Sequence, residues 1–313
     1  MSLNPPLSFK KDKDSKSELQ DISLTKEDPL QNLCLASQEV LQKAQQSGRA
    51  KCLKCGGSRM FYCYTCYIPV ETVPVEQIPV VKMQEIYSGG IKLPLKIDII
   101  KHPHETDGKS TAAHAKLLAP EDVNLYTYPC IPEYEERKHE IVLVFPGPNS
   151  VSIEDISLHL HKHSPSNVLY SSENDRPEKL PNKRQKMEVE ENGDAKDSSK
   201  RDSALLKKVV FIDSTWNQTH KIIADERLQG LLQVELKTRK TCFWRHQKGK
   251  PDTFLSTIEA IYYFLVDYHT AILKEKYKGQ YDNLMFFYSF MYQLIKNAKS
   301  SARKQQENNI INL

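Results

Sequence analysis

Four cysteines in two pairs constrain the fold of this chain more than any other feature of its sequence. The pairs are Cys52-x2-Cys55 and Cys63-x2-Cys66, with seven residues between them. Each pair can present two thiolates from one tight turn, and four sulfurs in a closed tetrahedron form a structural zinc site. We therefore predict a small zinc-ribbon lobe; a reduced, buried cysteine cluster is the alternative. A catalytic zinc is not expected, because four protein sulfurs leave no open position.

The sequence predicts a protein of a reducing compartment. No apolar run approaches the roughly 18 residues of a membrane span, and the N-terminus lacks the apolar stretch of a signal peptide. We expect a protein of the nucleus and/or cytoplasm with no membrane contact, where clustered cysteines favour metal over disulfides. The basic run Lys183-Arg184-Gln185-Lys186 favours the nucleus, although a solvated linker explains it equally well. The net charge of +4 does not by itself establish a nucleic-acid partner.

Composition also divides the chain into segments. Residues 1–28 are polar and aperiodic, which predicts a disordered tail. Residues 29–70 are expected to form a short helix and the zinc ribbon. Residues 91–300 are expected to form the main domain, interrupted by a polar, disordered insertion over residues 164–203. Residues 301–313 are expected to be a C-terminal tail.

The main domain alternates short strands with helices. An α/β fold with a partly parallel sheet and flanking helices follows from this alternation. Ser37 is a candidate N-cap and Gly48 a candidate stop for the short N-terminal helix, and Ser256 and Glu259 are spaced as a capping box. Strands are expected over residues 95–100, 123–128, 140–145, 205–213, 233–237 and 241–245, and helices from about 215, over 256–273 and over 282–299.

Polar or glycine-containing segments follow three of these strands. In open α/β sheets, ligands bind outside the carboxyl ends of the strands, so the three segments are expected to meet at one ligand site. Each segment also has an ordinary structural explanation, such as a helix cap, a core tryptophan or a surface loop. The segments are His102–Glu105, Pro146–Pro148 and Asp213–Trp216.

A basic segment, Lys237–Lys250, contains the aromatic residues Phe243 and Trp244. Cations next to aromatic rings suit phosphate contact with base stacking. A charged edge strand that protects itself from aggregation is the alternative. The chain lacks the GxGxxG, Walker A, HExxH and GxSxG motifs, which lowers the weight of the common dinucleotide enzymes, P-loop NTPases, zinc proteases and α/β-hydrolases.

The sequence Asp213-Ser214-Thr215-Trp216 after an apolar strand resembles the D-x-T-W signature of the DTW-domain proteins. The cysteine cluster, His102-Pro-x-Glu105, Phe145-Pro146-Gly147 and Ser256–Ala260 are similar to that family in the same order. The resemblance covers about residues 30–298, less the polar insertion. It implies a tRNA-uridine aminocarboxypropyltransferase, which moves the 3-amino-3-carboxypropyl group of S-adenosylmethionine to N3 of a D-loop uridine and releases 5′-methylthioadenosine. It also implies a SPOUT-like fold with a knotted cofactor site.

The resemblance assigns expected roles to individual residues. Uridine N3 carries a proton, so a carboxylate there could act as general base or hold the imide N–H, and Asp213 is the best candidate. Arg245, Lys109 and the helix start at Thr215 could bind the cofactor's carboxylate. Glu259 either positions the substrate or only completes its capping box. The expected catalytic residues are Asp213, Thr215 and Trp216; the expected cofactor-binding residues are Pro146, Gly147, Ser214, Arg245 and Glu259; the expected substrate or RNA contacts are His102, Glu105, Lys109, Lys237, Arg239, Lys240 and Lys248.

The expected partner is the D-loop region of tRNA, with no obligate protein partner evident. Two other functions remain open. One is methyl transfer from the same donor, and the other is a non-catalytic, zinc-stabilised RNA-binding module. The binding module predicts that Asp213→Ala leaves every function intact, whereas the transferase predicts lost turnover with RNA binding kept.

Overall fold

A computed structural model describes residues 30–79, 93–105, 108–162, 206–237, 239–245 and 251–311. The expected N-terminal tail, the insertion over residues 164–203 with the basic run Lys183–Lys186, and Lys248 lie outside these residues. The chain divides into two compact units, residues 1–32 and residues 33–313, and the second contains every helix and strand described below. Within the described residues, none of the helices has the length and apolar character needed to cross a membrane.

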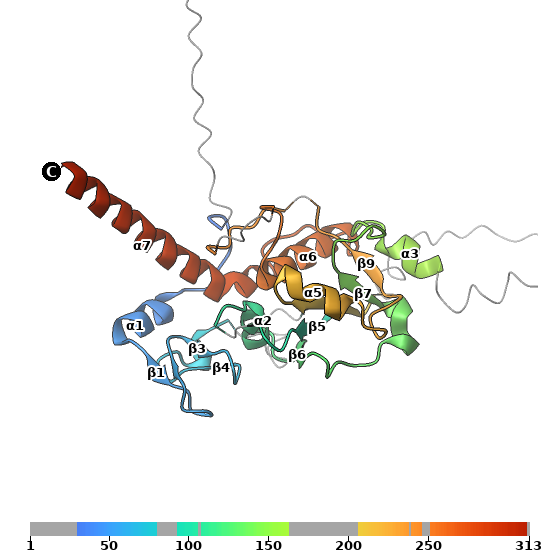
Figure 1. The fold of residues 1–313 in the computed structure, drawn as a ribbon, viewed down its shortest axis with the longest axis horizontal. Helices are drawn as coiled ribbons and strands as arrows, with labels where there is room; N and C mark the ends of the chain where they lie inside the picture. Colours follow the sequence, from blue (N-terminus) through green and yellow to red (C-terminus); the bar gives the residue numbers. More distant parts are fainter. Residues whose placement is uncertain are drawn as a thin grey trace, which may run out of the picture. The chain divides into compact units, whose positions relative to one another are not determined.

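A five-stranded sheet forms the centre of the second unit (Figure 1). Every pairing in it is parallel, which confirms the α/β class and extends the expected partly parallel sheet to a wholly parallel one among the described strands. Parallel strands need crossover connections, and the alternating helices supply them. The strand order is β6 (Val123–Thr127), β5 (Lys96–Lys101), β8 (Lys208–Asp213), β7 (Ile141–Val144) and β9 (Leu232–Val234).

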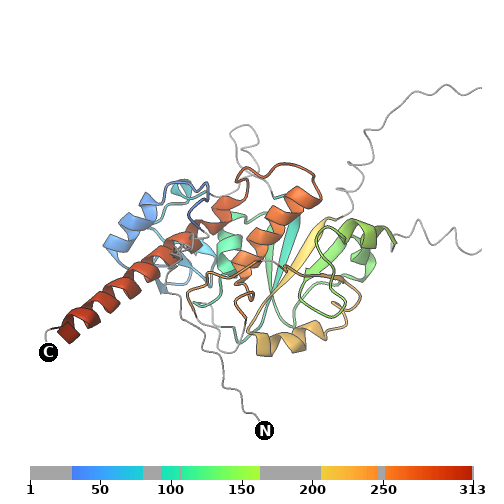
Figure 2. The same ribbon diagram turned by 90° about the horizontal axis from the view of Figure 1, so that it is seen from above.

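Helices cover both faces of this sheet, which explains why its central strands are almost continuously apolar. On one face, α6 (Thr257–Ala271) packs on β8, where the rings of Phe211 and Phe264 meet edge to face at 5.9 Å. α2 (Ala112–Leu118) packs beside α6. α5 (Trp216–Ile223) lies on the opposite face, as Figure 2 shows.

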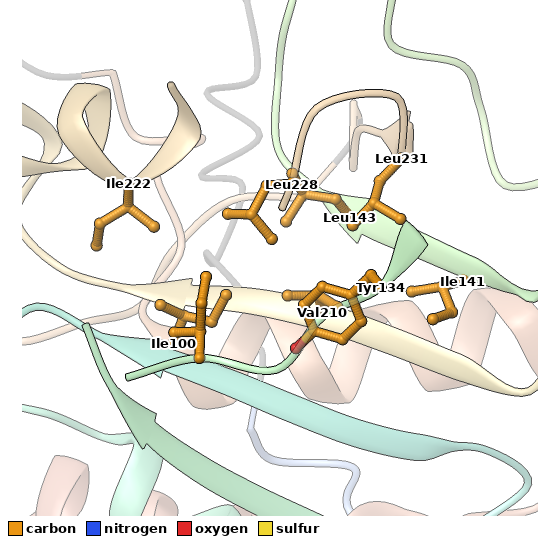
Figure 3. Close-up of a cluster of buried hydrophobic side chains, with 9 residues drawn as sticks. Ile100, Tyr134, Ile141, Leu143, Val210, Ile222, Leu228 and Leu231 are labelled. Carbon is orange, nitrogen blue, oxygen red and sulfur yellow. The ribbon is translucent and has the colours of Figure 1, made fainter. Parts of the chain in front are cut away.

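The core on the α5 face comes from residues that alternate along the strands (Figure 3). Ile100 of β5, Val210 of β8 and Leu143 of β7 point to the same side, because the side-chain period of a strand is two residues. Ile222 of α5 and Leu228 of the following loop close over them. This packing fixes where β8 ends, and therefore where the segment after Asp213 begins.

Helix ends follow the expectations at Gly48, which ends α1, at Thr215 and at Ser256, but not at Ser37. Thr215 and Ser256 both form capping boxes with the residue three positions on, and Glu259 is that residue in α6. Ser37 was predicted as the N-cap of the first helix, but α1 (Glu39–Ser47) has Gln38 in that position. The reason is tertiary: the Gln38 side-chain amide donates to the Phe286 carbonyl and to the Ser289 hydroxyl, which fixes the chain one residue later.

The remaining elements are short, except for the last helix. The strand expected over residues 241–245 is absent, and that segment is irregular. The last helix continues to Ile311, through residues that the sequence marked as a tail. These elements are the hairpins β1 (Ala50–Lys51) with β2 (Ser58–Arg59) and β3 (Tyr62–Cys63) with β4 (Ile68–Pro69), the helix α3 (Ile156–Lys162), the 3-10 turns η1 (Val75–Gln77), η3 (Glu135–Glu140) and η5 (Asp282–Met285), and the helix α7 (Phe286–Ile311).

Candidate active site and cysteine cluster

A cavity of about 650 Å³ lies at the carboxyl ends of β7, β8 and β9. The loop after β5 and the start of α6 complete its wall. Ligand sites of parallel sheets are expected at this edge, and the cavity brings together the three strand-end segments singled out in the sequence. The predicted site residues that line it are Glu105, Lys109, Pro146, Asp213, Ser214, Thr215, Trp216, Lys237 and Arg245.

Asp213 is the buried acid of this cavity, with its side chain only 3% exposed. Two hydroxyls donate to its two carboxylate oxygens: Ser110 to Oδ2 at 2.7 Å and Thr257 to Oδ1 at 2.6 Å. The backbone of Asp213 is also held, because its carbonyl accepts from the His102 N–H at 3.0 Å. Hydrogen bonds to both oxygens fix the orientation of the carboxylate in the cavity.

Glu105 is a second acid on the cavity wall. Burial raises the pKa of Glu105 above its usual range, and the negative charge of Asp213 raises it further. The cations Lys101, Lys109 and Arg245 act in the opposite direction and hold the pKa down. Besides Glu235, which pairs with Lys237, the cavity therefore contains two carboxylates in unequal environments, Asp213 and Glu105. Basic groups surround these two acids, and the arrangement is suited to holding and moving a proton.

Arg245 reaches the same wall from the irregular segment after β9. Its Nη2 donates to the Gly108 carbonyl at 3.1 Å. Its Nη1 is buried and has no hydrogen-bond partner within the described residues. A buried guanidinium nitrogen without an acceptor is costly, and a bound carboxylate would satisfy it. Arg245 is therefore the residue of the cavity wall best suited to bind an anion.

An aromatic wall borders the other side of the cavity. The ring of Trp216 lies 4.0 Å from that of Phe254, centroid to centroid, and 5.9 Å from that of Phe145. Phe254 therefore already packs against the Trp216 ring. The wall supplies apolar surface against which a flat heterocycle can pack.

The Gln233 side chain of β9 lies close to the backbone of Gly147, the residue after Pro146. A Cβ atom placed on Gly147 would collide with the Gln233 side-chain oxygen. Only glycine fits there without a shift of that side chain, and the Gly147 carbonyl also accepts from the Ser150 hydroxyl at 2.8 Å. Gly147 shapes the β7 loop but is not among the residues that line the cavity.

Glu259 also lies away from the cavity and is fully buried. Its carboxylate accepts from the backbone N–H and the hydroxyl of Ser256 and from the Thr241 hydroxyl and the Cys242 N–H. Of its two proposed roles, the capping box is the one that these contacts support. The same contacts explain the missing strand at residues 241–245, because Glu259 takes the backbone donor of Cys242 that a strand would use.

Three of the other expected RNA contacts, His102, Arg239 and Lys240, do not line the cavity. His102 is buried, and burial lowers its pKa, as do His104 and Lys221. Arg239 forms an ion pair with Asp267. Lys240 pairs with Asp252 at 3.1 Å, and Lys237, at the cavity edge, pairs with Glu235 at 2.8 Å. Lys248 lies outside the described residues.

Several residues of the cavity were not singled out from the sequence. Thr257 stands one position after a predicted N-cap, so its place at the edge of the sheet could have been found from the capping box. Ser110 and Phe254 lie in irregular segments and have no periodic or motif signal. Their roles depend on tertiary contacts, Ser110 with Asp213 and Phe254 with Trp216.

The four cysteines of the N-terminal lobe converge, as their spacing predicted. Their sulfurs all lie within 4.8 Å of one another. Zn–S distances of about 2.3 Å place the sulfurs of a tetrahedron roughly 3.8 Å apart, and the Cys55 and Cys63 sulfurs are 3.6 Å apart.

The two turns of this cluster have matching backbone hydrogen bonds. The Gly56 N–H donates to the Cys52 carbonyl at 2.8 Å, and the Tyr67 N–H donates to the Cys63 carbonyl at 2.7 Å. Gly56 and Tyr67 both have positive φ, 68° and 54°. The repeated turn orients each thiol pair toward the other, and the four residues fit a tetrahedral metal ion.

Comparison with known proteins adds a family and several relatives. A family model described as DTW domain matches residues 60–296. A protein of Pongo abelii named tRNA-uridine aminocarboxypropyltransferase 1 is 71% identical over 311 residues, which cover 97% of this chain and 98% of that protein. Proteins of the same name from Homo sapiens and Xenopus laevis are 70% and 58% identical, each over 97% of this chain and over 98% and 100% of their own lengths. No solved structure matches the chain.

Proposed function

The chain belongs to the DTW-domain family, and from that premise we propose that it is a tRNA-uridine aminocarboxypropyltransferase. The relatives carry this name and match nearly the whole chain. We propose further that the donor is S-adenosylmethionine and that the acceptor is N3 of a D-loop uridine, which yields 3-(3-amino-3-carboxypropyl)uridine. S-adenosylmethionine supplies a carbon made electrophilic by the neighbouring sulfonium: the N3–C bond forms, the C–S bond breaks, and the sulfur keeps the electron pair in 5′-methylthioadenosine.

The unpartnered Nη1 of Arg245 is the observation that supports this donor best. The transferred 3-amino-3-carboxypropyl group carries the carboxylate that Arg245 would bind; in methyl transfer the same carboxylate would instead stay on the leaving S-adenosylhomocysteine. Arg245 can fix the carboxylate beside Lys109, while the aromatic wall of Trp216 and Phe254 packs against the nucleoside end. The attacked carbon would then lie between the two ends of the cavity.

Asp213 and Glu105 handle the imide proton in this proposal. Uridine N3 is a poor nucleophile while it is protonated, so the proton must pass to a base as the N–C bond forms. The Asp213 carboxylate, held by Ser110 and Thr257, orients the N3–H. Glu105 has a raised pKa and can receive the proton either directly or through Asp213.

We propose that the cysteine cluster binds a structural zinc ion. Cys52, Cys55, Cys63 and Cys66 would supply all four ligands, so the metal stabilises the lobe and does not act on the substrate. We also include in the proposal a SPOUT-like, knotted arrangement at the cofactor site, supported by the family resemblance. The basic run Lys183–Lys186 supports a nuclear location.

The test is a transfer reaction with purified protein, unmodified tRNA transcripts and S-adenosylmethionine labelled in its aminocarboxypropyl carbons. Mass spectrometry of the digested RNA should reveal a labelled aminocarboxypropyl-uridine, and 5′-methylthioadenosine should appear in equal amount. Asp213→Ala should abolish the adduct while tRNA binding is kept. Asp213→Asn, which has the same shape without the charge, separates loss of charge from loss of packing.

Two other results would replace the proposal. S-adenosylhomocysteine together with a methylated base would indicate methyl transfer. No adduct across a full set of tRNAs, with donor binding and zinc content intact, would indicate the non-catalytic RNA-binding module.

A further inference from the structure

We propose that the C-terminal part of α7 is a phosphate-binding arm that holds the body of the tRNA outside the cavity. We define the arm as residues 296–305. The inference rests on the proposed function for the identity of the RNA, and it assigns a binding role to residues that neither the family signature nor the cavity includes.

Charge is the first reason. α7 contains Lys296, Lys299, Arg303 and Lys304 against a single acid, Glu307, a net charge of +3. The whole chain of 313 residues has a net charge of only +4, with 44 basic and 40 acidic residues. All residues outside α7 therefore have 40 basic against 39 acidic residues. Most of the excess positive charge of the molecule lies on one helix.

The placement of these cations on the helix is the second reason. Lys296, Lys299 and Arg303 are spaced i, i+3 and i+7, so they lie along one stripe, and Lys304 adjoins it. Between Lys296 and Lys304 the helix rises about 12 Å, enough to meet successive phosphates of a nucleic-acid backbone. Lys299 and Arg303 are also like charges at i, i+4, which weakens an isolated helix and is relieved by a polyanion.

The exposure and composition of the arm are the third reason. Every residue from Lys296 to Gln305 is exposed, and Figure 2 shows this end of α7 standing away from the sheet. Between residues 296 and 305 no side chain is both apolar and larger than alanine. A helix without an apolar stripe suits neither a hydrophobic groove nor the acyl region of a membrane, both of which need an apolar face. Phosphate contact requires only the cations.

The arm is connected to the cavity by one direct contact. The Lys299 ammonium donates to the Trp244 carbonyl at 3.2 Å. Trp244 lies between Phe243 and Arg245, which both line the cavity. An RNA held along the arm would therefore pass the segment that carries the donor-binding arginine. This suits an enzyme that must bind a folded tRNA while one loop uridine is turned out for reaction.

The contrast with the segment Lys237–Lys240 favours the arm as the main phosphate contact. In that segment the three cations each pair with an acid of the same fold, Glu235, Asp267 and Asp252. Their charge is largely neutralised before any RNA arrives. The arm contains four cations and no acid, and the rest of α7 adds only Glu307.

The experiment measures binding of the full chain to unmodified tRNA transcripts over a range of salt concentrations. The variant Arg303→Gln/Lys304→Gln removes two charges from exposed positions. The matched control, Lys276→Gln/Lys278→Gln, removes two charges from exposed positions in the loop between α6 and η5. Arg303→Lys keeps the charge at one position of the arm. Circular dichroism verifies that all variants keep the helix content of the wild type.

We expect the arm variant to bind tRNA roughly tenfold more weakly near 0.1 M salt. The slope of log K against log salt should become shallower by about one to two units, because each lost phosphate contact removes about 0.9. The control variant and Arg303→Lys should keep the wild-type slope. In the transfer assay the arm variant should show a raised KM for tRNA and an unchanged kcat.

An arm variant with the wild-type affinity and slope overturns the proposal, and so does a control variant that loses as much as the arm variant. If the arm variant keeps tRNA binding but loses binding to vesicles of anionic phospholipid, the arm binds a membrane surface and not RNA. The binding readout is independent of the transfer readout. Failure of the wild type to modify any tRNA would count against the proposed function alone, while the salt slope would still decide the role of the arm.

Discussion

At the scale of single residues, the cavity is organised by polar groups whose partners come from distant parts of the chain. Asp213 is held by Ser110 from the loop before α2 and by Thr257 from the start of α6. Arg245 is held at one nitrogen by Gly108 and has no partner at another among the described residues. The first group is fully satisfied and the second is not, and this difference separates a fixed part of the site from a part that awaits a ligand.

Arg245→Gln should weaken binding of S-adenosylmethionine by roughly ten- to a hundredfold, because a hydrogen bond to a charged group contributes about 1.5–3 kcal/mol. Binding of 5′-methylthioadenosine, which lacks the aminocarboxypropyl group, should not change. Isothermal titration calorimetry with both compounds measures the two affinities. An equal loss for both would mean that Arg245 does not bind the carboxylate.

Thr257→Val should lower kcat by roughly tenfold, since Asp213 loses one of its two hydroxyl donors while the volume of the side chain is kept. Thr253 lines the same cavity but is not one of the two hydroxyl donors to Asp213, so Thr253→Val is the matched control and should change kcat little. Single-turnover transfer measures the chemical step directly. Equal rates in both variants would show that the Thr257 hydroxyl does not position Asp213.

His114 makes stability depend on pH. Burial lowers its pKa to about 3, so the imidazole is neutral in the folded protein, next to the Tyr62 hydroxyl at 2.6 Å. The unfolded chain takes up a proton near pH 6.5, the ordinary pKa of histidine. The stabilising contribution is therefore complete above about pH 6.5 and is lost as the pH falls from there toward 3.

The wild type should lose up to about 1.4 kcal/mol of unfolding free energy per pH unit below pH 6.5 through this one group. His114→Gln should remove that part of the slope, and the exposed His220→Gln should leave it unchanged. Urea unfolding at stepped pH values measures both. A His114→Gln variant with the wild-type slope would contradict the neutral, buried imidazole.

At the scale of elements, the cysteine lobe is coupled to the helices by aromatic contacts. Phe61 meets Phe290 at 5.5 Å, and Tyr62 of β3 meets Phe287 at 5.0 Å, both edge to face. The hairpins of the lobe are only two residues long on each strand, too short to be stable alone. A metal ion can supply the missing stability. The aromatic contacts then hold the stabilised lobe against the start of α7.

Cys63→Ser should release the metal and lower the melting temperature by roughly 5–10 °C, because a loss of a few kcal/mol corresponds to about 2–4 °C per kcal/mol in a domain of this size. Cys130→Ser changes an exposed cysteine outside the cluster and should keep both zinc and melting temperature. Elemental analysis by mass spectrometry gives the zinc content per chain. Full zinc retention in Cys63→Ser would rule out the four-sulfur site.

At the scale of the whole molecule, charge is distributed unevenly over a nearly neutral chain. The cations of Lys237–Lys240 lie beside acids, whereas the sequence of α7 has four cations and one acid. The net charge of +4 therefore says little about where a polyanion binds. The local balance of charge, which depends on the fold, says more.

Lys237→Gln/Lys240→Gln should consequently reduce the salt slope of tRNA binding by less than Arg303→Gln/Lys304→Gln does. Both variants remove two charges, so the comparison holds net charge constant. Fluorescence anisotropy with labelled tRNA at several salt concentrations measures the slopes. A larger effect at Lys237 and Lys240 would return the main phosphate contact to the segment after β9.

Features that depend on local spacing could be predicted from the sequence alone. The two CxxC turns, the capping box of Ser256 and Glu259, and the alternation of apolar strands with helices depend on residues within one or two turns of one another. These were enough to predict the cysteine cluster, a partly parallel sheet and the strand edge that carries Asp213. The D-x-T-W motif gave the family, because its residues are consecutive.

Only the tertiary structure decided which residues meet across the sheet edge. Ser110 and Asp213 are 103 positions apart, and Arg245 reaches Gly108 across 137 positions, distances over which no periodicity carries information. The same long-range contacts overturned the strand at residues 241–245, whose backbone donor goes to Glu259, and moved the start of α1 past Ser37 through Gln38. Local propensity sets what a segment can form, and the hydrogen bonds and burial supplied by distant segments decide what it does form.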